Sequence, residues 1–502
     1  MATALWSCTL HNTTLFPASP GIATNSGSSA HGYVFNVRDY GAKGNGRTDD
    51  TQAIARALNA AIARGGGTVF FPKGIYDIVP AEGPFFVASN IEFAGVGRDS
   101  VLRVADDAGQ YNLIFGQHPG RVHDVAFRDL RFDQNPSGNR TADINPQTDA
   151  ENVIQLYSFD GVLIHNVAFN PEPGIQAIVA AGPNQPSHLT VSNCSFNFVR
   201  GKSSNPYYDE SSVYTEAGYA QIENDRFETT NAQNAITAIE LHGGPYVTVE
   251  NNSIHEFENG VNLEESTNGY PEVPAAHFKV THNAFEDTAM GIDLWSNAPR
   301  VLRDVTISEN AFSFSQHHLY HNLWIGIEFQ PGGRKVGLGG NFDGITVDNN
   351  SFDFSPLRHQ RIATTFSAAF DLAPDGRVRH FSARHNRAID PPAAGINVGK
   401  ISPANKSEDV LFQANVIDGA GWDLKAPPGE RSAVVLRDAT MRDVHADGNT
   451  IVAPARTAGI FSFIALPNAS STGVTLRYDG VKPPGLLAHR VSRRVDTTGT
   501  TF

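Results

Sequence analysis

Seven copies of one eight-residue pattern limit the folds open to this chain more than any other feature of its sequence. In each copy, apolar or small residues occupy the first, third and eighth positions, and asparagine occupies the sixth. Successive copies start 27 to 40 residues apart, a spacing that suits one coil of a β-solenoid with loops of varying size on one side. The asparagines are Asn252, Asn283, Asn310, Asn350, Asn386, Asn415 and Asn449.

Asparagine suits a repeated corner, because it tolerates left-handed backbone angles and stacked copies can hydrogen-bond along a column. A period of two and many Val, Ile and Phe residues favour strands over helices. We therefore expect an all-β, single-stranded parallel β-helix. A helix over residues 51–63 is expected to cap its open N-terminal end, where an uncovered edge invites aggregation. The predicted units are a flexible tail (1–32), the β-helix with its N-terminal cap (33–452), and a last coil with a C-terminal cap (453–502).

A second repeated segment lies between the asparagine windows and reads small, apolar, polar, apolar, variable. Because alternate side chains of a strand face opposite ways, the apolar pair should point into the core and the other two outward. The first outward column is then Glu240, Asn262, Asp293, Glu328, Asp371 and Asn397. The second is His242, Glu264, Trp295, Gln330, Ala373 and Gly399. We expect both columns to line one exposed groove.

Composition excludes several classes of protein. Carboxylates exceed Lys plus Arg by 52 − 38 = 14, which argues against nucleic acid or an anionic membrane as the main partner. No run of about 18 apolar residues is present, so no membrane span is expected. The two cysteines, Cys8 and Cys194, are too few for a disulfide framework, and Cys194 is predicted to be a buried free thiol. No signal peptide is visible, so the compartment stays open, with a slight preference for a secreted or extracytoplasmic protein.

The N-terminal region resembles a known family. Phe35-Asn-Val-Arg-Asp-Tyr-Gly-Ala-Lys-Gly-Asn-Gly-Arg-Thr-Asp-Asp50, a helix, and Gly66-Gly-Thr-Val-Phe-Phe-Pro-Lys-Gly74 are similar to the opening module of the pectate-lyase-like superfamily. This resemblance implies a right-handed parallel β-helix that acts on polysaccharides, and several members form trimers. It does not specify the reaction, because the superfamily includes hydrolases, lyases, epimerases and transferases. The Asp-Pro-His-Asp segment of alginate epimerases is absent, and no catalytic residue can be carried over by motif.

The outward acids are therefore the candidates for catalysis. Neighbouring coils lie about 4.8 Å apart, so ionised acids on successive coils would repel one another, and at least one pKa should rise. Glycosidases use two carboxyl groups about 5–5.5 Å apart when they retain configuration and about 6.5–9.5 Å apart when they invert it. We expect Asp293 and Glu328 to form the acid/base pair, with Glu240 and Glu264 in reserve. Substrate-binding candidates are His242, Asn262, Trp295, Gln330, Asp371, Tyr270 and Trp324. Of these, Tyr270 and Trp324 are expected on adjoining loops.

The favoured function is cleavage of glycosidic bonds in a neutral poly- or oligosaccharide, by hydrolysis or intramolecular glycosyl transfer, without a cofactor. A uronate lyase needs Lys, Arg or bound Ca²⁺ to neutralise the substrate carboxylate, and no cation occupies either column. A calcium-dependent lyase and a non-catalytic, tailspike-like carbohydrate-binding protein stay as alternatives. A further alternative is that the two columns are only the solvent-exposed face of the strands, without a role in catalysis.

Overall fold

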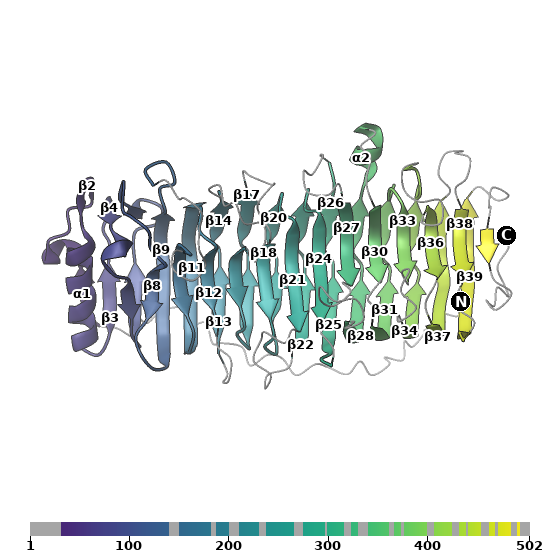
Figure 1. The fold of residues 1–502 in the computed structure, drawn as a ribbon, viewed down its shortest axis with the longest axis horizontal. Helices are drawn as coiled ribbons and strands as arrows, with labels where there is room; N and C mark the ends of the chain where they lie inside the picture. Colours follow the sequence, from purple (N-terminus) through teal and green to yellow (C-terminus); the bar gives the residue numbers. More distant parts are fainter. Residues whose placement is uncertain are drawn as a thin grey trace, which may run out of the picture.

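A computed structural model describes residues 32–139, 150–181, 187–199, 210–229, 237–265, 275–296, 299–315, 323–329, 340–360, 366–372, 376–398, 406–423, 431–437, 440–452, 461–466, 470–482 and 489–491. Their strands form an elongated stack of coils along one axis (Figure 1). Every pairing between strands is parallel in the described residues, which defines a parallel β-helix as predicted from the repeats. None of the described helices is long and apolar enough to cross a membrane.

Two sheets make up the stack. The first, sheet B, takes one strand from each coil in chain order. Its strands are β5 (Phe85–Val87), β8 (Leu113–Gln117), β10 (Asn152–Leu156), β12 (Gln176–Ala180), β15 (Ser211–Thr215), β18 (Thr237–His242), β21 (Asn259–Glu265), β24 (Met290–Ser296), β27 (Leu323–Phe329), β30 (Phe366–Leu372), β33 (Ala394–Val398), β36 (Ser432–Arg437), β38 (Phe461–Leu466) and β40 (His489–Val491).

The other 26 strands form sheet A, the remaining wall of the coils. They are β1 (Val34–Asn36), β2 (Asn45–Asp49), β3 (Gly67–Phe70), β4 (Gly74–Ile78), β6 (Ile91–Ala94), β7 (Ser100–Val104), β9 (Val122–Asp133), β11 (Phe159–Glu172), β13 (Leu189–Ser192), β14 (Ser195–Phe198), β16 (Ala220–Glu223), β17 (Arg226–Thr229), β19 (Thr248–Glu250), β20 (Ser253–His255), β22 (Ala276–Thr281), β23 (Ala284–Glu286), β25 (Leu302–Ser308), β26 (Ala311–Ser313), β28 (Asn341–Asp348), β29 (Ser351–Asp353), β31 (Arg377–Arg384), β32 (Arg387–Ile389), β34 (Lys406–Gln413), β35 (Val416–Asp418), β37 (Thr440–Val452) and β39 (Thr472–Lys482).

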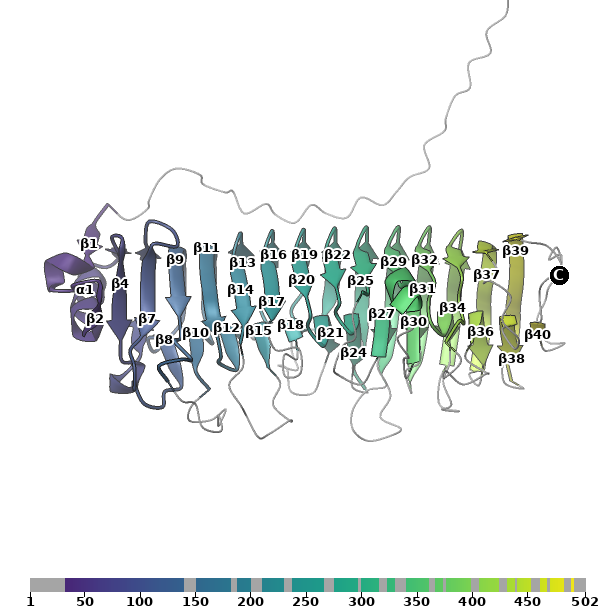
Figure 2. The ribbon, with the colours of Figure 1, turned by 90° about the horizontal axis from the view of Figure 1, so that it is seen from above.

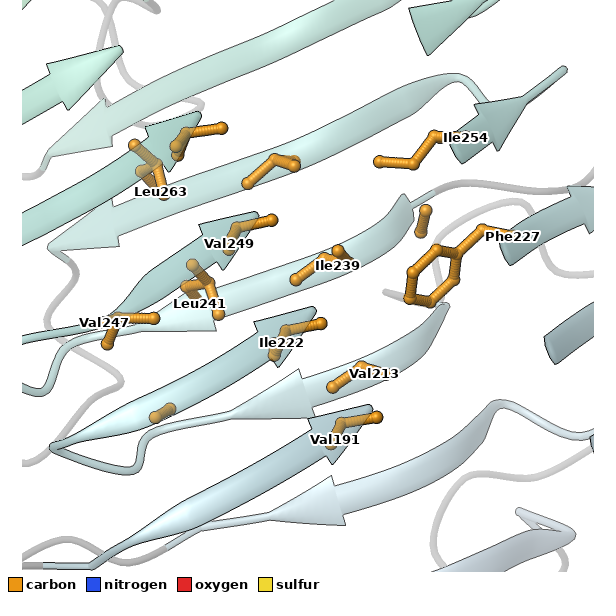
Figure 3. Packing of buried hydrophobic residues seen from close by; sticks show 14 of the residues in the cluster. Val191, Val213, Ile222, Phe227, Ile239, Leu241, Val247, Val249, Ile254 and Leu263 are labelled. Carbon is orange, nitrogen blue, oxygen red and sulfur yellow. The ribbon is translucent and has the colours of Figure 1, made fainter. Parts of the chain in front are cut away.

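A typical coil runs through β21, β22 and β23 and returns to sheet B at β24, so that Asn259 lies beside Met290. The apolar side chains of both sheets point into the coil and form one continuous core (Figure 3). Ile239 and Leu241 of β18 belong to it and are fully buried. The polar residues between them therefore lie on the opposite side of the strand.

The asparagine column is confirmed. Six of the asparagines sit between two strands of sheet A, and Asn449 lies within β37. Each of the seven directly follows a residue with left-handed backbone angles. In a representative coil, the Oδ1 atom of Asn310 accepts from the backbone N–H of Asn283 at 2.9 Å and from its Nδ2 atom at 3.0 Å. The Nδ2 atom of Asn310 donates to the carbonyl of Val280 and to Oδ1 of Asn350, both at 3.0 Å. The column thus satisfies its own polar groups inside the protein.

Packing also explains the small residue that precedes the two core-facing residues in strands of sheet B. A side chain at Gly291 would place its Cβ atom 2.3 Å from the ring of Phe312, and one at Gly326 would lie equally close to Phe352. Phe285, Phe312 and Phe352 stack on successive coils with ring centroids 4.6 Å apart. Glycine at these positions lets the strand approach the ring stack closely.

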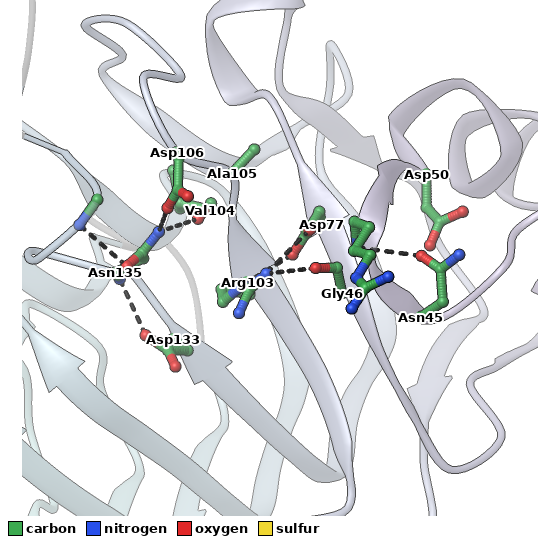
Figure 4. A network of polar contacts seen from close by, with 12 residues as sticks. Asn45, Gly46, Asp50, Asp77, Arg103, Val104, Ala105, Asp106, Asp133 and Asn135 are labelled. Atoms are coloured by element: carbon green, nitrogen blue, oxygen red, sulfur yellow. Dashed lines mark hydrogen bonds and ion pairs between the residues drawn. The ribbon is translucent and has the colours of Figure 1, made fainter.

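The N-terminal module holds its glycine-rich loop with its own side chains (Figure 4). The two carboxylate oxygens of Asp50 accept from the backbone N–H groups of Lys43 and Gly44 at 2.6 and 2.9 Å. Arg103 donates to Asp77 and to the carbonyl of Gly46. Asp50 occupies the N-cap position of helix α1 (Thr51–Ala63) without a side-chain capping bond.

Helix α1 packs against β1 and β3 and lies at the N-terminal end of the stack (Figure 2). The helix is therefore present where the sequence predicts it, while its protective role as a cap stays a prediction. Parallel pairing continues past residue 452 through β38 and β40. Cys194 is a buried free thiol, as expected.

Candidate functional site

The first polar column lies in register over six successive coils of sheet B, as predicted. The strand pairings align each member with the next along the axis of the solenoid. The members are Glu240, Asn262, Asp293, Glu328, Asp371 and Asn397. Four carboxylates therefore share one face of the sheet within five coils.

The expected solvent exposure of this column is wrong. Glu240 is 4% exposed, Asp293 2% and Asp371 2%, and both asparagines are buried. Glu328 is the exception among the six, since it is half-buried. Facing away from the core is thus not the same as facing solvent here, and the acids occupy a polar layer against the outer side of sheet B.

The second column is in register where it is described. His242 of β18 lies beside Glu264 of β21, which lies beside Trp295 of β24. The next three positions, Gln330, Ala373 and Gly399, lie outside the described residues, as does Tyr270. Their predicted place in the groove stays a prediction.

Glu240, His242 and Glu264 form a buried charged cluster. The Nε2 atom of His242 lies 2.6 Å from Oε1 of Glu240 and 3.0 Å from Oε2 of Glu264. Burial alone would lower the pKa of His242, but the hydrogen bonds and charges of both glutamates outweigh it and raise this pKa well above its usual value. These three residues also form a group that could hold a metal ion, because their ligand atoms all lie within 4.8 Å of one another.

Two residues beside this cluster escaped the sequence analysis. Tyr214 on β15 lies in register with Glu240, and its ring contacts that of His242 at a centroid distance of 4.9 Å. The Tyr214 hydroxyl donates to Oε1 of Glu216 at 2.7 Å. Burial raises the pKa values of both Tyr214 and Glu216. The available signal was Tyr-Thr-Glu at residues 214–216, at the end of β15.

The two tryptophans have different places. Trp295 is half-buried on the polar side of β24, and its buried indole N–H has no hydrogen-bond partner among the described residues. Such a donor is suited to a substrate oxygen. Trp324 was expected on a loop at the groove, and that is wrong: it lies in β27, is fully buried, and packs edge-on against Phe314 in the core.

The sequence matches a family model described as rhamnogalacturonase A/epimerase, pectate lyase-like, over residues 34–273. Curated relatives match short segments. Alginate lyase 7 of Azotobacter vinelandii is 37% identical over 108 residues, and mannuronan C5-epimerase AlgE3 of the same organism is 43% identical over 108 residues. Each match covers 20% of this chain but only 13% and 6%, respectively, of the relative's length.

A solved structure with a similar fold is a mutant tailspike protein of Escherichia coli bacteriophage HK620 in complex with a pentasaccharide. It superposes with a TM-score of 0.65 at 14% identity, covering 87% of this chain and 79% of the tailspike chain. The coils, the registers and this superposition define a parallel β-helix protein. Over residues 34–273 the chain also resembles the pectate-lyase-like family that this model describes.

Proposed function

We propose that this protein cleaves glycosidic bonds of a neutral poly- or oligosaccharide, with Asp293 and Glu328 as its acid/base pair. The observation that carries the proposal is the register of these two acids on adjacent coils. Neighbouring strands are about 4.8 Å apart, which corresponds to the shorter carboxyl separation of retaining glycosidases, about 5–5.5 Å. We therefore expect the product to keep the configuration of the substrate.

The two acids differ in environment, and this supports different roles. Asp293 is buried and so the less accessible of the two, and we assign to it the donation of a proton to the leaving oxygen. Glu328 is half-buried and so more accessible to a sugar ring, as a nucleophile needs to be. In this scheme Glu328 forms a bond to the anomeric carbon while the glycosidic bond breaks. Water or a substrate hydroxyl then releases the sugar.

The neighbouring groups suit a neutral glycan. Asp371 accepts from Nδ2 of Asn397 at 2.8 Å, leaving the amide oxygen of Asn397 without a partner among the described residues. Asn262 likewise has an unpartnered amide oxygen in the part of the chain that is described. Trp295 offers an indole N–H and an aromatic surface. Sugar hydroxyls donate to such oxygens and accept from such N–H groups.

A second candidate is a lyase acting on a uronate polymer. It is supported by the segment shared with alginate lyase 7 and by the pairing of Tyr214 with His242, since tyrosine and histidine serve as general acid and base. An acidic groove would repel a polyuronate unless a cation such as Ca²⁺ neutralised it. The tailspike likeness keeps a non-catalytic carbohydrate-binding protein as a third outcome.

One experiment separates the three. The protein is incubated with a panel of neutral and uronic polysaccharides, and the products are analysed by mass and by absorbance near about 235 nm, where the unsaturated ends left by lyase elimination absorb. The hydrolase is supported if saturated fragments form and if Asp293→Asn and Glu328→Gln abolish them. The control is Glu286→Gln, which changes an exposed acid of sheet A and should still form the fragments. Unsaturated products that disappear on chelation support the lyase. Binding of a glycan without any product supports the carbohydrate-binding protein.

A further inference from the structure

We propose that Glu240, His242 and Glu264 bind one divalent transition-metal ion. Glu240 and His242 are two residues apart on β18 and so lie on the same side of the strand, and Glu264 is the residue of β21 in register with His242. Three potential ligand atoms, Nε2 of His242 and one oxygen from each glutamate, thus converge from two adjacent coils and lie within 4.8 Å of one another.

The distances between these atoms are close to those of a metal site. In a tetrahedral site with bonds of about 2.0–2.1 Å, ligand atoms lie about 3.4 Å apart. The Nε2 atom of His242 is 2.6 Å from Glu240 and 3.0 Å from Glu264, so metal entry requires each contact to open by less than about 1 Å. Rotations of the two glutamate side chains can provide this movement.

Charge and burial favour a divalent cation. His242 is 7% exposed and Glu264 1%, so the cluster is removed from water. Two carboxylates and one imidazolium carry a net charge of −1, which is costly to bury. A divalent cation with two carboxylates and neutral imidazole is uncharged. Burying that set therefore costs less.

A second observation points to a ligand. One oxygen of Glu240, Oε2, has no hydrogen-bond partner among the described residues, although its side chain is only 5% exposed and its other oxygen contacts His242. Buried unsatisfied polar atoms in a native structure call for an explanation such as an absent ion.

The ligand types specify the class of metal. Imidazole suits Zn²⁺ and related first-row ions, and carboxylates suit Mn²⁺, whereas Ca²⁺ prefers oxygen ligands alone. Three protein ligands leave at least one coordination position for water or a substrate oxygen, as in catalytic zinc sites. This differs from the calcium that a uronate lyase would use.

The surface of sheet A provides a matched control of the same composition. His282 lies between Glu250 and Glu309, but it contacts them through opposite ring nitrogens, Nδ1 at 3.6 Å and Nε2 at 2.9 Å. Its side chain is 45% exposed. These three groups cannot meet at one ion, so the cluster should not bind a metal with comparable affinity.

The test is calorimetric titration of the chelator-treated full chain with ZnCl₂, MnCl₂ and CaCl₂. We expect one Zn²⁺ or Mn²⁺ per chain, at least about 100-fold weaker binding in Glu264→Gln and Glu240→Gln, and unchanged binding in His282→Asn. Thermal melts of each variant without metal check that it is folded. If Zn²⁺ and Mn²⁺ do not bind, if Ca²⁺ binds more tightly, or if Glu264→Gln and Glu240→Gln bind as the unmodified chain does, the proposal is wrong.

Metal binding at these residues is independent of whether the protein cleaves a glycan. Stoichiometric binding in a protein without activity on any polysaccharide would support the metal site and count against the proposed hydrolase. Full activity in a chain that binds no Zn²⁺ or Mn²⁺ would do the reverse.

Discussion

Two buried polar columns run along this β-helix, and they differ in how they satisfy their hydrogen bonds. The column at the corner of sheet A repeats asparagine in seven coils, and each amide both donates to and accepts from its neighbours. The column on sheet B mixes glutamate, aspartate and asparagine on six coils. In that second column, oxygens of Glu240, Asn262 and Asn397 have no partner among the described residues.

This difference indicates what each column is for. A chain that buries polar groups for stability pairs them completely, because each unpaired group costs about 1–3 kcal/mol. A chain that buries polar groups one above another and leaves some of their atoms unpaired sacrifices stability. Proteins accept such a cost mainly at functional sites. The asparagine column therefore builds the fold, and the sheet B column is the candidate for chemistry.

The largest expected effect is on turnover and involves only the sheet B column. Asp293→Asn and Glu328→Gln should lower turnover roughly 10³-fold, because each removes a proton donor or nucleophile at the scissile bond. Unfolding free energies should change by less than about 1 kcal/mol, since the amides keep the shape of the acids that they replace. Steady-state kinetics on the substrate found in the polysaccharide screen, with urea unfolding of the same samples, measure both. Near-normal turnover in either variant would end the assignment.

The opposite pattern is expected in the asparagine column. Asn310→Leu removes the acceptor of two Asn283 donors and the two bonds donated by its own amide. We expect a loss of roughly 3 kcal/mol or more in unfolding free energy, because several buried groups lose their partners together. Turnover measured well below the melting temperature should stay normal. A nearly neutral Asn310→Leu would break the comparison between the columns.

A third change sharpens the comparison at the end of the asparagine column. Asp225 occupies the next position before Asn252: its backbone N–H donates to Oδ1 of Asn252 at 2.9 Å, and its own Oδ1 accepts from the backbone N–H of Cys194 at 2.6 Å. Its other oxygen has no partner among the described residues. Burial raises the pKa of Asp225 well above its usual value. Asp225 thus takes the place of an asparagine in the column, with a carboxyl group whose pKa is raised by burial.

The sign of the pH effect follows from this raised pKa. The folded chain holds the Asp225 proton more tightly than the unfolded chain, so the contribution to stability is complete below the unfolded value of about 3.8 and is lost as pH rises through the folded pKa. Asp225→Asn should remove this dependence. At neutral pH it should raise the unfolding free energy by roughly 1–2 kcal/mol. Urea unfolding from pH 4 to 8 tests it, and a variant less stable than the parent at pH 7 would contradict it.

The fold was predictable because its determinants are local and repeated. Asparagine recurs at seven corners, and two alternating core residues with a small residue before them recur in six segments, so a single sequence contains many copies of the same evidence. The Asp225 coil was overlooked because an acid replaced the asparagine that identified the other windows. Its window, which starts at Ala220, otherwise keeps the pattern.

The site was only partly predictable. Alternation along a strand tells which side chains face away from the core, and this correctly aligned Glu240 with Asp293 and Glu328. It carries no information on what covers the outer face, so the burial of Glu240 and Asp293 was missed. Trp324 was misplaced because the repeat was taken to begin at Gly326, whereas β27 begins at Leu323 and Trp324 already joins the core.

The smallest expected effect concerns the two clusters of one histidine and two glutamates. On the surface of sheet A, Nε2 of His282 lies 2.9 Å from Oε2 of Glu309, and water screens this contact. Exposed ion pairs contribute about 0–1 kcal/mol to stability. His282→Asn should therefore change the unfolding free energy by less than about 0.5 kcal/mol, and 1 M salt should reduce even that. Urea unfolding at two salt concentrations measures it. A large, salt-resistant loss would mean that this surface cluster resembles the buried one, and that composition alone, rather than burial and convergence on one point, decides what such a cluster does.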